Sequence, residues 1–177
     1  LYEEVTGPGE DQQTVYHKRF YEGAKSNTNF YTVYNSFLRN IISPIFDDNI
    51  LFQKIPTFRV QPPDHIAVTA YHKDKDYSHS EHEVNFYLPL TKAWETNTIW
   101  VETDINSKVF CPIEANVGEV IMWDGANLLH GNKKNDTGKT RISIDFRVLL
   151  VSEFCENDDI SIANKTPMNI GGYWEIL

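Results

Sequence analysis

Cysteine is scarce in this chain of 177 residues, which holds only Cys111 and Cys155. The two stand far apart and form no Cys-x-x-Cys pair, so neither a disulfide framework nor a thiolate metal site is indicated. We expect both to be reduced thiols in the protein core. A reducing, cytoplasmic location is the corresponding expectation.

A long apolar run and an excess of basic residues are also lacking. No stretch approaches the roughly 20 apolar residues that span a membrane, and no basic-then-apolar signal segment opens the chain. The 16 Lys and Arg are outnumbered by 25 Asp and Glu, which gives a net charge of -9. We therefore expect a small-molecule substrate, with no nucleic-acid or membrane partner. The acidity serves either solubility or the attraction of cationic substrates.

Hydrophobic residues make up 41% of the chain and aromatic residues 13%, which is typical of a globular protein. The length suits a single domain over residues 1–177. Residues 1–49 are predicted to form a helical cap, with a weak helical pattern at 10–24 and a stronger one at 29–42 that Pro44 ends. The apolar face of the stronger helix is expected to comprise Phe30, Val33, Tyr34, Phe37, Leu38 and Ile41.

Residues 50–151 have a different pattern, which predicts a β barrel or sandwich. Short apolar or alternating segments follow one another, separated by turn residues. Many short strands at regular spacing are typical of these folds. The segments lie at 50–55, 57–60, 65–72, 83–90, 97–103, 108–115, 119–124, 128–131 and 140–151. Residues 152–177 are expected to form a loose C-terminal tail.

The predicted last strand has two unlike faces. In RISIDFRV, the apolar residues Ile142, Ile144, Phe146 and Val148 alternate with the polar residues Arg141, Ser143, Asp145 and Arg147. On a surface strand the polar face would meet solvent, with Asp145 and Arg147 as a surface ion pair. In a barrel it would instead line an interior site, while the apolar face packs under the helix at 29–42. The segment EVNFYLPL shows the same split, with Asn85 and Tyr87 on its polar side, and so favours a polar interior.

The stretch HKDKDYSHSEHE, residues 72–83, contains candidate metal ligands. It offers two His-x-acid pairs, one starting at His72 and one at His79. Two histidines and one carboxylate on one face of the metal are the ligand set of iron(II) oxygenases, whereas the HExxH motif of zinc hydrolases does not occur. The pair His72 and Asp74 is favoured because His72 ends a predicted strand that fixes its direction. The pair at His79 lies in a polar loop, with nothing obvious to orient it.

A third ligand and an anion anchor follow downstream. His130 comes after the Asp124-Gly125 turn, and Arg141 starts the last strand eleven residues later. Arginine offers a planar, permanently charged, bidentate donor for a carboxylate. Ser143, on the same face of the strand, can donate one more hydrogen bond. The whole set is far more specific than any of its parts.

With these residues in place, the chain resembles the iron(II)/2-oxoglutarate-dependent oxygenases over residues 55–150. Within that superfamily it most resembles the streptomycin-biosynthesis-type, phytanoyl-CoA-dioxygenase-like group. The resemblance is carried by HKDKDY, EVNFYLPLT, TNTIWVE, GEVIMWDGANLLHGN and NDTGKTRISIDFRV. It implies a mainly β fold, a double-stranded β-helix (a cupin-like jelly-roll), with the N-terminal helices packed on one sheet.

The resemblance also implies a cofactor set. His72, Asp74 and His130 would bind Fe(II), while Arg141, Ser143 and Thr98 would hold the distal carboxylate of 2-oxoglutarate. With O2, the enzyme would hydroxylate or otherwise oxidise a polar small molecule or natural-product intermediate, releasing succinate and CO2. Related halogenases keep the carboxylate position small, so Asp74 favours hydroxylation over halogenation.

Four residues are candidates for substrate contact: Asn85, Tyr87, His79 and Trp123. Two other functions are kept open, a cupin-type metalloenzyme that does not use 2-oxoglutarate and a non-enzymatic jelly-roll binding module. Arg141 and Ser143 speak against the cupin, which needs no carboxylate anchor on its last strand. A homodimer is a further possibility that exposed aromatic residues suggest.

Overall fold

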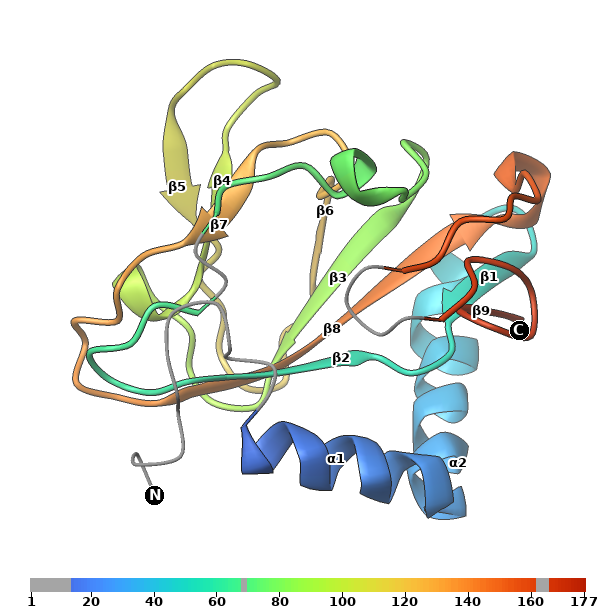
Figure 1. The fold of residues 1–177 in the computed structure, drawn as a ribbon, viewed down its shortest axis with the longest axis horizontal. Coiled ribbons are helices and arrows are strands. Elements are labelled where there is room, and N and C mark those ends of the chain that lie inside the picture. The colour runs from blue at the N-terminus through green and yellow to red at the C-terminus, as the bar shows by residue number, and fades with distance from the viewer. Residues whose placement is uncertain (1–13, 68–69, 162–165) are drawn as a thin grey trace.

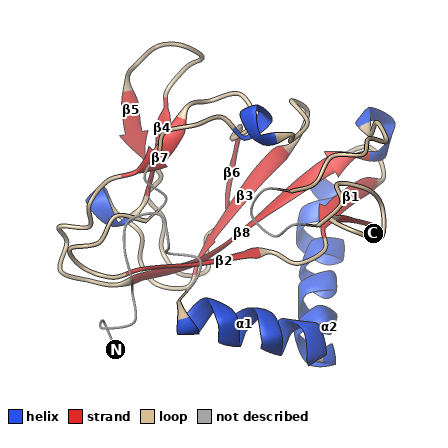
Figure 2. Cartoon of the chain, in the orientation of Figure 1, coloured by secondary structure: helices blue, strands red, loops and turns tan. Residues whose placement is uncertain are grey.

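The N-terminal part of the chain forms two helices. The computed structural model describes residues 14–67, 70–161 and 166–177. Helix α1 spans Val15–Ser26 and helix α2 spans Thr28–Phe37, continued by a π-helical turn at Leu38–Ile42 and a 3-10 turn at Ser43–Ile45. The side chain of Asn27 caps α2 by accepting hydrogen bonds from the backbone N–H groups of Asn29 and Phe30. Both helices lie along one side of the main sheet (Figure 2).

Two antiparallel sheets contain the strands of the described structure. The larger has strand order β6-β3-β8-β1-β9, with β2 also paired to β8, and the smaller has order β5-β4-β7. The strands are β1 (Ile50–Gln53), β2 (Thr57–Gln61), β3 (Val84–Pro89), β4 (Ile99–Glu102), β5 (Phe110–Pro112), β6 (Ile121–Trp123), β7 (His130–Asn132), β8 (Arg141–Leu150) and β9 (Trp174–Ile176). This mainly β, jelly-roll architecture confirms the predicted fold class. Figure 1 shows β3 and β8 running between the small sheet and the β1–β9 end.

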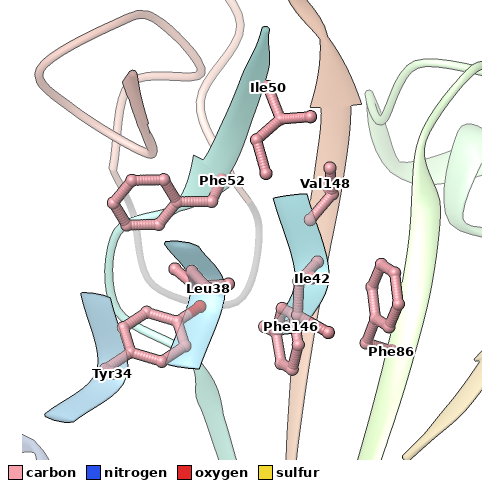
Figure 3. Packing of buried hydrophobic residues seen from close by; sticks show 8 residues of the cluster. All are labelled: Tyr34, Leu38, Ile42, Ile50, Phe52, Phe86, Phe146 and Val148. Atoms are coloured by element: carbon pink, nitrogen blue, oxygen red, sulfur yellow. The ribbon is translucent and has the colours of Figure 1, made fainter. Parts of the chain in front are cut away.

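Strand β8 separates the hydrophobic core from the polar interior. It pairs with β1 at one end, β2 at the other and β3 along its middle. On its apolar face, Phe146 and Val148 pack against α2 and its π turn, as the alternation predicted. The core cluster comprises Tyr34, Leu38, Ile42, Ile50, Phe52, Phe86, Phe146 and Val148 (Figure 3).

The apolar face of the N-terminal helix differs in part from the prediction. Val33 is 69% exposed and Ile41 56% exposed, while Ile42 is buried in the core. The π turn explains the second difference, because its i→i+5 bonding makes the turn wider and places Ile42, not Ile41, on the face of Leu38.

The predicted strand at 65–72 does not form a continuous strand over its described residues. It makes isolated bridges from Ile66 to Lys134 and from His72 to His130, and residues 68–69 lie outside the described part. The positive φ of 65° at Asp64, next to Pro62-Pro63, redirects the chain just before the segment. The part of the first predicted helix at residues 10–13 also lies outside the described residues.

The C-terminal segment is not a loose tail. Strand β9 pairs with β1, and Met168, Tyr173 and Trp174 are buried against Leu51 and Leu149. The expectation for the cysteines was wrong as well, because Cys111 and Cys155 are free but exposed rather than buried. Among the described residues, no helix is long and apolar enough to cross a membrane.

A histidine at the start of α1 makes the stability of the fold depend on pH. His17 is fully buried, with Nδ1 2.7 Å from Thr14 Oγ1. Burial, aided by the charge of Arg59, lowers its pKa to about 4. The fold therefore favours neutral His17, whereas the unfolded chain takes up a proton near the ordinary pKa of about 6.5. This contribution to stability is complete above pH 6.5 and is lost as the pH falls towards 4.

We predict that His17→Phe weakens this pH dependence. Between about pH 7 and about pH 4.5, the wild type should lose roughly 2–3 kcal/mol more unfolding free energy than the variant. Urea unfolding at the two pH values measures both losses, and His82→Asn, at an exposed histidine, is the matched control. Equal losses in the wild type and His17→Phe would contradict the assignment.

Candidate metal centre

The three predicted ligands converge at one end of the jelly-roll. His72 and His130 face each other across an antiparallel bridge, in which His72 N donates to His130 O at 2.9 Å and His130 N to His72 O at 3.0 Å. Asp74 begins the 3-10 turn Asp74–Tyr77, and its N–H donates to Gly125 O at 3.0 Å. Backbone hydrogen bonds thus fix all three Cα positions before any side chain is considered.

Each histidine directs the same nitrogen to the centre. His72 Nδ1 lies 2.9 Å from Ala70 O and His130 Nδ1 lies 3.0 Å from Leu128 O. A carbonyl only accepts, so each Nδ1 carries the proton and each Nε2 offers its lone pair. Both Nε2 atoms lie 3.6 Å from Asp74 Oδ1. Donors around one metal at about 2.1 Å would be roughly 3 Å apart, so a small contraction closes this triangle.

The two oxygens of Asp74 have different surroundings. Oδ2 accepts hydrogen bonds from Asn85 Nδ2 at 2.7 Å and from Arg147 Nε and Nη2 at 2.9 and 2.7 Å. Oδ1 faces the two histidines. Burial alone would raise the pKa of Asp74, but the charge of Arg147 outweighs it, and with His72 and His130 holds the pKa well below its usual range. The group is therefore an ionised carboxylate with one oxygen available to a cation.

His130 is prepared to act as a neutral ligand. Burial lowers its pKa to about 4, although Asp74 opposes the shift. The imidazole is therefore unprotonated near neutral pH, as a metal ligand must be. Trp123 packs edge-on against its ring, with centroids 4.7 Å apart.

The site is more accessible on its His72 side. The side chain of His72 is 19% exposed, against 9% for His130 and 3% for Asp74. Tyr77, itself 39% exposed, packs edge-on against His72 at 5.2 Å. A ligand would reach the metal past these two rings.

Arg141 lies buried at the other end of the polar face of β8. Its Nε donates to Asn97 O at 2.9 Å, Nη1 to Ser143 Oγ at 3.1 Å and Nη2 to Gln61 Oε1 at 3.0 Å. Guanidinium has five N–H donors. Two of them, one on each terminal nitrogen, therefore lack a hydrogen-bond partner among the described residues. A carboxylate is the natural acceptor for such a pair.

Thr98 is adjacent to this group but does not bond to Arg141. Its hydroxyl donates to Ile113 O at 2.7 Å and lies 3.4 Å from Tyr87 OH, and all three side chains are buried. Thr98 is connected to the arginine through Asn97, its neighbour in the chain. Tyr87, from the central strand β3, thus lies beside the suggested cosubstrate residue Thr98.

The surface pair of Asp145 and Arg147, which was one of the two alternatives for this face, does not occur. Arg147 pairs with Asp74, while Asp145 pairs with Arg59 from β2. Both acids and both arginines are largely buried, because the polar face of β8 lines the interior. The polar face of β8 thus points to the interior, and the surface alternative is wrong.

His79 lies outside the metal cluster. Its Nδ1 is 2.8 Å from Glu83 Oε2, and Ser80 N donates to Glu83 Oε1 at 2.8 Å. Asn127 holds the same loop by donating to Glu81 O at 2.9 Å. These bonds tie the loop down. Its histidine is paired with a carboxylate and does not contact Asp74.

The sequence did not predict four residues that hold the side chains of the site in place. They are Gln61, Glu83, Arg147 and Tyr173. Arg147 shares the polar face with Arg141, six residues away, so the alternation placed it correctly but did not identify its partner. Gln61 is opposite Arg141 in the β2–β8 register. Tyr173 lies in the segment expected to be a tail, which left no signal for it.

Fold and site together define a jelly-roll protein with a two-histidine, one-carboxylate cluster that could hold a metal ion. No family model matches the chain. The streptomycin biosynthesis protein StrG of Streptomyces griseus is 39% identical over 167 residues, which cover 94% of this chain and 78% of that protein. The chain belongs to the StrG family.

Solved structures show the same fold at low sequence identity. HygX from Streptomyces hygroscopicus, with nickel and 2-oxoglutarate bound, has a TM-score of 0.53 at 10% identity, and covers 98% of this chain and 90% of its own. The apo form of ThoJ, a non-heme monooxygenase, has a TM-score of 0.51 at 13% identity, covering 85% of this chain and 61% of its own. At these identities the likeness establishes the architecture.

The choice between the two His-x-acid pairs can be tested by metal binding. We predict that His130→Ala loses Co(II) binding by at least about 100-fold, because a ligand is removed. His79→Ala should keep Co(II) affinity within a few-fold of the wild type, since His79 pairs with Glu83 and not with a member of the cluster. Isothermal titration of metal-free protein with Co(II) measures both. Loss of binding in His79→Ala alone would reverse the ligand assignment.

Proposed function

We propose that this protein is an Fe(II)- and 2-oxoglutarate-dependent oxygenase that hydroxylates a polar small molecule. The observation that carries the proposal is that one polar interior holds both a cluster of metal-binding side chains and a buried arginine. At one end, Asp74 directs one carboxylate oxygen at the Nε2 atoms of His72 and His130. At the other, buried Arg141 retains two N–H donors that have no partner within residues 14–67, 70–161 and 166–177. A metalloenzyme with no carboxylate-bearing cosubstrate would not need the second group.

The donor set fits the metal. Two imidazole nitrogens and one carboxylate oxygen, without thiolate, are the donors that non-heme Fe(II) oxygenases use. In support, HygX is a protein of this fold whose structure holds nickel and 2-oxoglutarate. When bound, the metal and cosubstrate supply oxidation by O2, at the expense of converting 2-oxoglutarate to succinate and CO2.

Residues of the chain provide orientation and charge. His72, Asp74 and His130 donate from one side, so positions on the opposite side stay available to cosubstrate and oxygen. Because Asp74 itself fills the carboxylate position, no vacancy is left there for a halide. Arg141 would receive the far carboxylate of 2-oxoglutarate through its two remaining N–H groups, with Ser143 fixing the guanidinium plane.

Residues around the centre control access. Trp123 covers one face of the site against His130, and Asn85 is occupied by Asp74. The more exposed side, at His72 and Tyr77, is therefore the proposed route of entry for the substrate. We propose a polar natural-product intermediate, because the related StrG is named for streptomycin biosynthesis and the protein carries a net charge of -9.

Turnover of the cosubstrate tests the proposal. Protein reconstituted anaerobically with Fe(II) and then given air, ascorbate and 2-oxoglutarate should form succinate even without its true substrate. Succinate is measured by mass spectrometry, with His130→Ala as the metal-free control. If the protein binds metal but forms no succinate, either alone or with any substrate screened, the cupin-type alternative is favoured.

We predict that Arg141→Gln raises the KM for 2-oxoglutarate by roughly 10- to 100-fold, because charge-assisted hydrogen bonds to the carboxylate are lost. Co(II) affinity should remain within a few-fold of the wild type, since Arg141 contacts no metal ligand. Succinate formation against 2-oxoglutarate concentration gives the KM. An unchanged KM in the folded variant would show that the cosubstrate is anchored elsewhere.

A further inference from the structure

Arg147 is a largely buried cation, with its side chain 12% exposed, that lies between two carboxylates at the metal end of β8. Its Nε and Nη2 both donate to Asp74 Oδ2, and its Nε lies 3.7 Å from Glu83 Oε2. Its Nη1 donates to Tyr173 OH at 3.0 Å. Three separate segments of the chain therefore hold one guanidinium.

The contacts of Arg147 with Asp74 are one-sided. The Nε and Nη2 groups of Arg147 and the Nδ2 group of Asn85 all donate to Oδ2. The other oxygen, Oδ1, lies 3.6 Å from His72 Nε2 and from His130 Nε2. With one oxygen held by three donors, the carboxylate cannot rotate to present both oxygens to a metal without breaking them.

Arg147 is in turn fixed by residues distant in sequence. Tyr173 is buried and stands just before β9, whose pairing with β1 anchors it. Glu83 is buried beside β3, where it also binds His79 Nδ1 and Ser80 N. The orientation of the guanidinium therefore depends on the C-terminal segment and on the loop that follows Asp74.

We propose that Arg147 is a positioning residue for the metal ligand Asp74, and that Tyr173 extends this role to the C-terminal segment. Arg147 holds Oδ2 so that Oδ1 alone faces the histidines, and the positions opposite stay open. This inference rests on the metal centre of the proposed function. It goes further in making the C-terminal segment part of that centre.

Two effects of Arg147 on a bound cation oppose each other. Its charge repels the metal, which would weaken binding. Without it, however, Asp74 would be a carboxylate buried without a partner charge and held by one remaining donor, which is a costly arrangement. Removing groups that orient metal ligands typically costs 10- to 100-fold in affinity, so we expect positioning to outweigh repulsion.

The test is a titration of metal-free protein with Co(II). Isothermal titration calorimetry measures the affinity, and the visible absorption of the bound ion reports its coordination. The variants are Arg147→Met, which keeps the length but not the donors, Arg147→Lys, which keeps the charge, and Tyr173→Phe, which removes one acceptor. Arg59→Met is the matched control, because it removes an interior arginine whose carboxylate partner, Asp145, does not contact the cluster. All are compared at a temperature where circular dichroism shows them folded.

We expect Arg147→Met to weaken Co(II) binding by roughly 10- to 100-fold and to change the absorption spectrum of the saturated protein. Arg147→Lys should restore part of the affinity, Tyr173→Phe should lose a few-fold, and Arg59→Met should match the wild type. A purely structural role would lower thermal stability but leave the affinity and spectrum of the folded protein unchanged, and that result overturns the inference.

Two further outcomes are informative. If Arg147→Met does not fold, Arg147→Lys and Tyr173→Phe decide, and wild-type affinity and spectrum in both overturn the inference. If the wild type itself fails to bind Co(II), the proposed function falls together with the inference. Metal binding by the wild type with no effect of any variant removes only the positioning role.

Discussion

The structure depends on the alternation of side chains along β8. Because successive residues of a strand point to opposite faces, Phe146 and Val148 close the core under α2 while Arg141 and Arg147 enter the interior. The same ten residues thus join the helical cap to the site. A register slip of one residue would exchange the two faces, burying the arginines in an apolar core.

Placing charge inside a small β fold is costly unless each charge has a partner. In the interior, most arginines meet this requirement by pairing with carboxylates of their own. Arg147 is matched by Asp74 and Glu83, and Arg59 by Asp145. Arg141 is the exception, because its described partners are neutral side chains and a carbonyl. Its uncompensated charge is the strongest structural indication that an anion belongs in this interior.

The convergence of His72, Asp74 and His130, and the shared face of Arg141 and Ser143, could be predicted because they follow from spacing in the sequence. His72 and Asp74 are close in the chain, and strand periodicity places Arg141 and Ser143 on one face. The apolar and polar faces of β3 and β8 were predicted for the same reason. The comparison with StrG then shows the family, which agrees with the motifs that suggested it.

Contacts between distant segments could not be predicted. The sequence places Arg147 on the polar face but does not reveal that it reaches Asp74, 73 residues away. Tyr173 was not predicted to be structured because GGYWEIL contains too short an apolar run to indicate a strand. The π turn that exchanges Ile41 for Ile42 leaves no pattern of its own. The strand expected to end at His72 is interrupted, and its direction comes instead from the bridge to His130.

The most direct test of the account is a crystal structure of the protein grown anaerobically with Fe(II) and 2-oxoglutarate. We predict one metal bound by Nε2 of His72, Nε2 of His130 and Oδ1 alone of Asp74. The far carboxylate of the cosubstrate should lie against the guanidinium of Arg141. A metal bound at His79 and Glu83, or a cosubstrate carboxylate away from Arg141, would contradict the account.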